Sequence, residues 1–75
     1  MPAWKDRIEA RPEVLFGKPA IKGTRISVEH ILRKLAAGMT PEEIVAEHPH
    51  ITVDDIHAAE AFAADYLAEE EIALG

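Results

Sequence analysis

The stretch GMTPEEIVAEHPHITVDDI, residues 38–56, carries helix start and stop signals in close succession. Thr40 is a predicted N-cap, Pro41 takes the first helical position, and Glu43 stands three residues after the cap, where its carboxylate completes a capping box. Pro49 ends this short helix, because proline has no N–H to continue it. Thr52 is the predicted cap of a further helix. The stretch therefore predicts two helices joined by a short turn.

Helical patterns also precede and follow this stretch. From Val28 to Ala36 apolar residues recur at helical spacing, with Ser27 as the predicted N-cap. Gly38 is the predicted C-cap, because glycine readily takes the left-handed conformation that ends a helix. The helix after Thr52 is predicted to run to about residue 71. Three helices in this order have the spacing of a helix-turn-helix domain.

The last predicted helix has two sides of different character. Its inward stripe is apolar and comprises Ile56, Ala59, Phe62, Ala63, Tyr66 and Leu67. Its other side is small and acidic and comprises Ala58, Ala61, Ala64, Asp65, Ala68 and Glu69. Small side chains let another helix approach closely, so this side is a candidate interface with a partner protein. Alternatively, the alanines serve only as strong helix formers.

Residues 1–26 are predicted to form short strands and a basic loop. Alternation around Arg7–Ala10 and the run Val14–Phe16 favour extended backbone. The pairs Ala20–Ile21 and Arg25–Ile26 flank a short connection that contains glycine, which predicts a hairpin. The residues that we expect to shape the turns are Gly17, Pro19, Gly23, Thr24 and Gly38.

The whole chain, residues 1–75, is predicted to be one domain of mainly α (α+β) class, with helices over 27–71 and an end segment at 72–75. A chain of 75 residues without cysteine builds a small core that no disulfide reinforces, so we expect at least a homodimer. The sequence has no apolar window of 18 residues and no signal-peptide pattern. We therefore expect a cytoplasmic protein without membrane contact.

Charge is distributed unevenly along the chain. All eight basic residues lie before residue 35, and with four acids they give residues 1–37 a net charge of +4. Residues 38–75 hold ten acids and no Lys or Arg, a net charge of −10. The two halves either neutralise each other on folding or face different partners. The cations that we expect to bind a nucleic acid or a partner are Lys18, Lys22, Arg25, Arg33 and Lys34.

The third helix argues against sequence-specific reading of DNA. A recognition helix presents Arg, Lys, Asn or Gln to base edges, whereas this helix opens with Asp54, Asp55 and His57. Carboxylates at these positions repel phosphates. We therefore expect any DNA contact to come from the basic residues through the phosphate backbone, which gives affinity with little sequence reading.

The sequence gives little indication of an enzyme. A phosphate-binding P-loop needs a lysine directly after its second glycine, and Thr24 stands there instead. His48, His50 and His57 lack the spacing of a metal site, so we expect turn histidines, no metal and no cofactor. The alternative is a small enzyme built on these histidines and nearby acids. Because no nucleophile or carboxylate pair stands at catalytic spacing, we expect no enzyme and no small-molecule substrate.

Several short motifs together resemble one known family. They are Pro12-Glu13-Val14, Gly17-Lys18-Pro19, Ile21-Lys22-Gly23-Thr24-Arg25-Ile26, Ala36-Ala37-Gly38-Met39-Thr40, Glu42-Glu43-Ile44, His48-Pro49-His50-Ile51 and Asp55-Ile56. On these motifs the chain resembles DUF433, a family of small prokaryotic domains treated as VapB-type antitoxins. The resemblance covers roughly residues 7–68.

The resemblance implies a compact helix-turn-helix-like domain with N-terminal strands, often dimeric, whose operon partner is a PIN-like toxin related to ribonucleases. It implies an antitoxin-like module that binds this toxin and, in addition, its own promoter DNA. The acidic last helix is then expected to cover the cationic RNA groove of the toxin. The alternative is a protein-interaction or assembly domain with no nucleic-acid contact. The resemblance carries over no catalytic residue.

Overall fold

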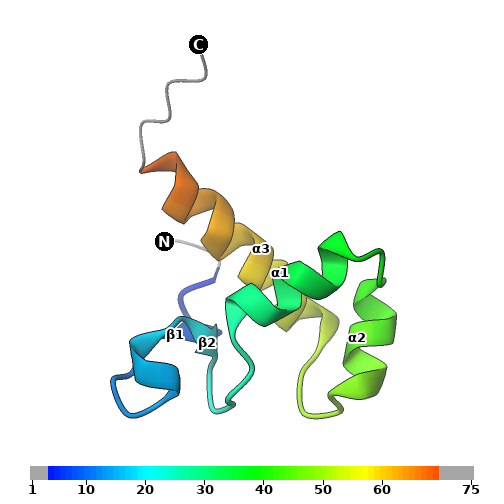
Figure 1. Ribbon diagram of the computed structural model, residues 1–75, viewed down its shortest axis with the longest axis horizontal. Helices are drawn as coiled ribbons and strands as arrows, with labels where there is room; N and C mark the ends of the chain where they lie inside the picture. The colour runs from blue at the N-terminus through cyan, green and yellow to red at the C-terminus, as the bar shows by residue number, and fades with distance from the viewer. Residues whose placement is uncertain (1–3, 70–75) are drawn as a thin grey trace.

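The computed structural model describes residues 4–69 and contains three helices and a two-stranded antiparallel sheet (Figure 1). The elements in chain order are β1 (Ile8–Glu9), the 3-10 turn η1 (Leu15–Gly17), β2 (Ala20–Ile21), α1 (Val28–Ala36), α2 (Pro41–Glu47) and α3 (Val53–Ala68). This confirms the predicted α+β class, mostly helical, with three helices after short N-terminal strands. Within residues 4–69, no helix is long and apolar enough to cross a membrane.

The helices begin where the predicted caps stand. The Ser27 hydroxyl accepts a hydrogen bond from the backbone of α1. Thr40 and Glu43 form the reciprocal capping box of α2. A second box, between Thr52 and Asp55, starts α3. Side chains that satisfy the first free N–H groups of each helix therefore set all three starts.

The strands pair differently from the prediction. β1 and β2 are antiparallel partners, with Ile8 opposite Ile21. The predicted partner of β2, residues 25–26, contributes one backbone hydrogen bond, from Ile21 N to the Ile26 carbonyl at 2.9 Å. The chain reverses between them at Gly23, whose N–H donates to the Glu9 carboxylate of β1 at 3.0 Å. The predicted turn is therefore present, but β1 supplies the longer pairing.

The run Val14–Phe16, predicted to be extended, forms a left-handed turn instead. Leu15, Phe16 and Gly17 have φ angles of 51°, 57° and 85°. The Gly17 N–H donates to the Val14 carbonyl at 3.0 Å and closes the turn. Non-glycine residues rarely adopt positive φ, so a pattern of apolar residues gave no sign of this conformation.

One hydrophobic core joins the helices and the sheet. Its largest fully buried side chains are Ile31, Ile44, Ile51 and Ile56, which come from α1, α2, the turn before α3, and α3. Ile8 and Ile21 extend this core to the sheet. α3 contacts α1, α2 and β1, so it is the central element of the fold.

The predicted inward stripe of α3 is correct only over the first part of the helix. Ile56 and Ala59 are fully buried, whereas Tyr66 and Leu67 are 56% and 53% exposed. The reason is length: α3 has 16 residues and α1 has 9, which corresponds to about 24 Å against about 14 Å. The last turns of α3 therefore extend past α1 (Figure 1). α3 is defined to Ala68, and both its predicted end near residue 71 and the predicted end segment 72–75 lie outside the described residues.

Candidate functional site

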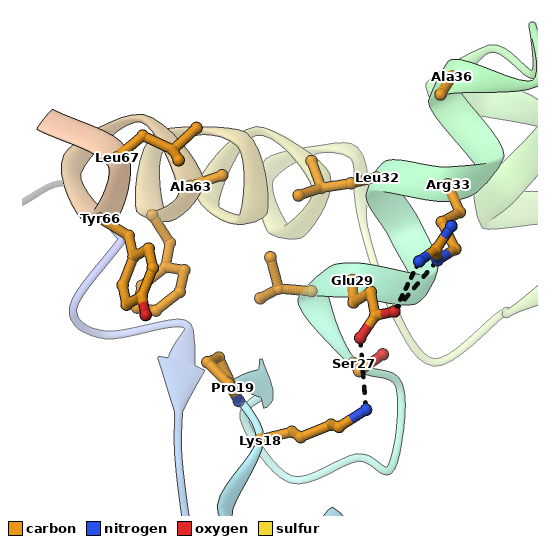
Figure 2. A pocket seen from close by; sticks show the side chains of 12 residues that line it. Lys18, Pro19, Ser27, Glu29, Leu32, Arg33, Ala36, Ala63, Tyr66 and Leu67 are labelled. Carbon is orange, nitrogen blue, oxygen red and sulfur yellow. Dashed lines mark hydrogen bonds and ion pairs between the residues drawn. The ribbon is translucent and has the colours of Figure 1, made fainter. Parts of the chain in front are cut away.

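The overhang of α3 leaves an apolar groove between α1 and α3. The cavity has a volume of about 570 Å³. Leu32 from α1 and Ala63, Tyr66 and Leu67 from α3 line it, and Pro19 lies beside them near β2 (Figure 2). A groove of this size, with mostly apolar walls and an open side, suits an apolar side chain of another molecule better than a charged ligand.

A small charged network forms the rim of this groove. The Glu29 carboxylate accepts hydrogen bonds from Lys18 Nζ at 3.4 Å and from Arg33 Nε at 3.1 Å (Figure 2). The hydrogen bond from Arg33, and then that from Lys18, hold the pKa of Glu29 below its ordinary value of 4.5. These side chains are exposed, so the network adds little stability. Its two cations and one anion leave the rim weakly positive.

The five cations predicted to bind a partner do not form one free patch. Two of them share Glu29 at the groove rim. Lys34 pairs with Glu47, and its hydrogen bond is the main cause of a lowered Glu47 pKa. Lys22 and Arg25 are exposed, and neither forms an ion pair within the part of the chain that the structure describes. Within the described residues, folding thus pairs three of these cations with two acids and leaves Lys22 and Arg25, near the β2 turn, without an ion pair.

The outer face of α3 contains most of the predicted partner interface. Its exposed members are Ala64, Asp65, Ala68 and Glu69, with Ala61 half-buried. The prediction was wrong for Ala58, which is 5% exposed and packs in the core. α1, α2 and β1 all contact α3. The residues near the C-terminal end of α3 are more exposed than those around Ala58. Asp65 also accepts a hydrogen bond from Trp4 Nε1 at 2.7 Å, which fastens the N-terminal segment to this helix.

An ion pair that the sequence analysis missed joins β1 to the start of α3. Arg7 Nη1 donates to Asp55 Oδ1 at 3.0 Å, and Arg7 Nη2 lies 3.8 Å from Asp54 Oδ2. The Asp55 side chain is 13% exposed and the Asp54 side chain 75%, so Asp55 is the principal partner. The sequence does signal one of the two contacts of Asp55, its capping bond to Thr52, because Asp55 stands three residues after that cap. Nothing local marks Arg7 as its second partner.

The histidines lie at turns and on exposed helix faces. His48 caps α2, and its ring lies edge-to-face with that of His30, with the ring centres 5.9 Å apart. His48 Nε2 is buried and has no hydrogen-bond partner in the described structure. Within residues 4–69, no group of three or more His, Cys, Asp or Glu side chains is arranged to hold a metal ion.

The fold and these surfaces define a small α+β domain in which three consecutive helices pack together and α3 contacts a two-stranded sheet. The chain matches the family model described as "Protein of unknown function (DUF433)" over residues 8–63, and it belongs to this family. The predicted family resemblance is thereby confirmed. The description of the family assigns no activity and does not mention antitoxins.

The chain is also similar to two other proteins. "Uncharacterized protein y4eO" of Sinorhizobium fredii is 28% identical over 61 residues, which cover 81% of this chain and 28% of that protein. The crystal structure of a DUF433 member protein from Anabaena variabilis superposes with a TM-score of 0.79 at 26% identity, covering 87% of this chain and 64% of that one. The chain therefore spans less than two thirds of the length of either protein.

Proposed function

We propose that this chain is a non-enzymatic, antitoxin-like module that binds a PIN-like ribonuclease through the outer face of α3. The charge of that face carries the proposal. Its exposed carboxylates are those of Asp54, Glu60, Asp65 and Glu69. The sequence has no Lys or Arg after residue 34, so α3 has no cation of its own, and of these four carboxylates only Asp54 forms an ion pair within the described residues, with Arg7 at 3.8 Å. A ribonuclease must hold RNA phosphates with cationic groups, and an acidic helix complements such a groove.

The shape of this face also suits a protein partner. Ala64 and Ala68 are one helical turn apart and exposed, so a partner surface can approach the helix axis closely. Helical spacing puts Glu60 and Asp65 on either side of this alanine strip. The family resemblance supplies the class of partner, and the acidic, small-residue face supplies the surface by which we expect it to be bound.

A charge reversal tests the proposal more cleanly than a truncation. Removing residues 58–75 would take Ala58 and Ala59 out of the core and unfold the domain. Glu60→Lys instead reverses one exposed charge near the middle of α3. Glu42→Lys makes the same change at an exposed position of α2 and serves as the matched control.

The measurement is titration calorimetry with the product of the neighbouring gene, combined with inhibition of RNA cleavage. We expect Glu60→Lys to weaken binding and inhibition by about tenfold or more, because a lysine would face the cations of the partner. The Glu42→Lys protein should bind like the wild type. Full inhibition by Glu60→Lys would exclude the outer face of α3. Absence of any bound nuclease would exclude the antitoxin role and favour an assembly domain.

Promoter binding is a second candidate, supported by Lys22 and Arg25. Both are exposed and neither pairs with an acid among residues 4–69, so both are available to phosphates. Contacts of this kind depend on salt, and replacing both residues by alanine should reduce the slope of log K against log salt by about 2 per protomer. Failure of the wild-type protein to bind its promoter duplex at low salt would favour a module without nucleic-acid contact.

A further inference from the structure

Phe16 is the most unusual exposed residue of the described chain. Its relative exposure is 101%, so its ring has no covering contact within the protomer. It sits in the middle of the left-handed turn η1, where Leu15 and Phe16 both have positive φ. Each such non-glycine residue is strained, and the strain persists only where the surroundings hold it. The turn therefore combines backbone strain with a fully exposed aromatic ring, a combination that occurs at binding sites.

The apolar groove between α1 and α3 lies close to this ring. Pro19 lines the groove and follows Phe16 by three residues. Three residues of chain span at most about 11 Å, so the backbone of Phe16 lies within that distance of the Pro19 edge of the groove. Within the groove, Phe62 and Tyr66 already stack on each other, with ring centres 6.1 Å apart. A further aromatic ring fits such a wall, since aromatic pairs favour separations of about 4.5–7 Å.

We infer that the groove receives Phe16 of a second copy of this chain, and that its own Phe16 enters the groove of that copy. One protomer carries both the inserting ring and the receiving groove, side by side. That is the requirement for a two-fold dimer, in which the same patch meets itself and both contacts close at once. Neither contact leaves a free ring or a free groove, so the assembly stops at two.

The distribution of charge favours a second copy as the occupant. The chain has a net charge of −6, and two acidic α3 faces would repel each other. The surface around Phe16 and the groove holds Lys18 and Arg33 with Glu29, and Arg11 paired with Glu13 at 2.8 Å. These three cations and two carboxylates leave a net charge of only +1. Two copies that meet through this surface therefore repel each other much less than they would through their acidic α3 faces.

The two Phe16 rings make up only part of the area that a stable dimer buries. Two buried phenyl rings remove about 300–500 Å² from water, and a stable interface needs about 1,200–2,000 Å² in total. Tyr66 and Leu67, more than half exposed beside the groove, supply further apolar surface in each copy. Self-association would also reinforce the small core of a 75-residue chain.

The first test is sedimentation equilibrium of the wild type and of Phe16→Ala. We expect a dimer for the wild type and a dissociation constant more than about a hundredfold higher for Phe16→Ala, because each dimer loses two buried rings. Since the ring is fully exposed in the protomer, the far-UV circular dichroism of the variant should be unchanged.

The second test blocks the groove instead of removing the ring. Ala63→Trp fills the groove, and Ala46→Trp adds the same side chain at an exposed site of α2 as the control. We expect Ala63→Trp to be monomeric and Ala46→Trp to be dimeric. A mixture of Phe16→Ala with Ala63→Trp should then associate, because the ring of one fits the open groove of the other. This mixed pair retains one of the two contacts, so it should be weaker than the wild-type dimer.

Three results would overturn the inference. They are a monomeric wild type at millimolar concentration, an unchanged dissociation constant for Phe16→Ala, and no association in the mixture of the two variants. The inference does not depend on the proposed ribonuclease partner, which is assigned to the acidic outer face of α3. Glu60 does not line the groove, so Glu60→Lys should dimerise normally even where it fails to bind a nuclease, and the two proposals can fail separately.

Discussion

Asp55 holds together two parts of the fold that are far apart in the sequence. One carboxylate oxygen accepts from the Thr52 backbone at 2.9 Å, and the other accepts from Arg7 at 3.0 Å. We expect Asp55→Ala to lower the free energy of unfolding by about 2–4 kcal/mol, because both the cap of α3 and a charged hydrogen bond are lost. Urea denaturation followed by circular dichroism measures this change.

Asp54→Ala is the control for this prediction. Asp54 lies 3.8 Å from the same arginine but its side chain is 75% exposed. Its loss should cost about 0.5 kcal/mol or less, as is usual for exposed ion pairs. Equal costs for the two substitutions would show that Asp55 contributes only as an acid near Arg7 and not as a cap.

The same residues show what a sequence can reveal at this scale. The caps Ser27, Thr40 and Thr52 were predictable, because a cap and the N–H that it binds are two or three residues apart. The bond from Arg7 to Asp55 joins residues 48 positions apart. Only the packed fold brings these two side chains together, so no spacing rule could reveal the pair.

At the scale of elements, helical periodicity predicted where the helices lie in the sequence better than it predicted which of their residues are buried. The stripe from Ile56 to Leu67 has regular spacing, but Tyr66 and Leu67 at its end are more than half exposed. The length of a neighbouring helix is not encoded in the stripe itself. For this reason the groove at Tyr66 and Leu67, which arises from the difference in length, could not be predicted from the sequence.

The turn η1 offers a prediction that separates backbone strain from the exposed ring. Phe16→Gly and Phe16→Ala both remove the ring, but only glycine accepts φ near 57° without strain. Relief of about 1–3 kcal/mol of strain exceeds the entropic cost of glycine, about 0.5–1 kcal/mol. We expect the glycine variant to be more stable than the alanine variant by about 1 kcal/mol, measured by urea denaturation of the two monomers. Equal stability would mean that residue 16 is not held in the left-handed region.

At the scale of the whole molecule, folding partly neutralises the two oppositely charged halves of the sequence. Arg7 pairs with acids of α3 and Lys34 with Glu47 of α2. These contacts use cations of residues 1–37 and acids of residues 38–75, as one of the two sequence-based readings expected. Most acids of α3 remain exposed, so the surface still separates a near-neutral groove from an acidic helix face.

This separation predicts opposite responses of the two proposed interfaces to salt. Raising the ionic strength from about 0.01 M to about 1 M shortens the Debye length from about 30 Å to about 3 Å. The complex with a cationic partner should weaken by about tenfold or more, because attraction to the acidic face of α3 is screened. The dimer should keep its affinity or gain some, since its contacts are apolar and salt screens the repulsion between two copies of net charge −6. Calorimetry and sedimentation over one salt series measure both responses, and a dimer that dissociates as salt rises would show that charge, not the Phe16 ring, holds the copies together.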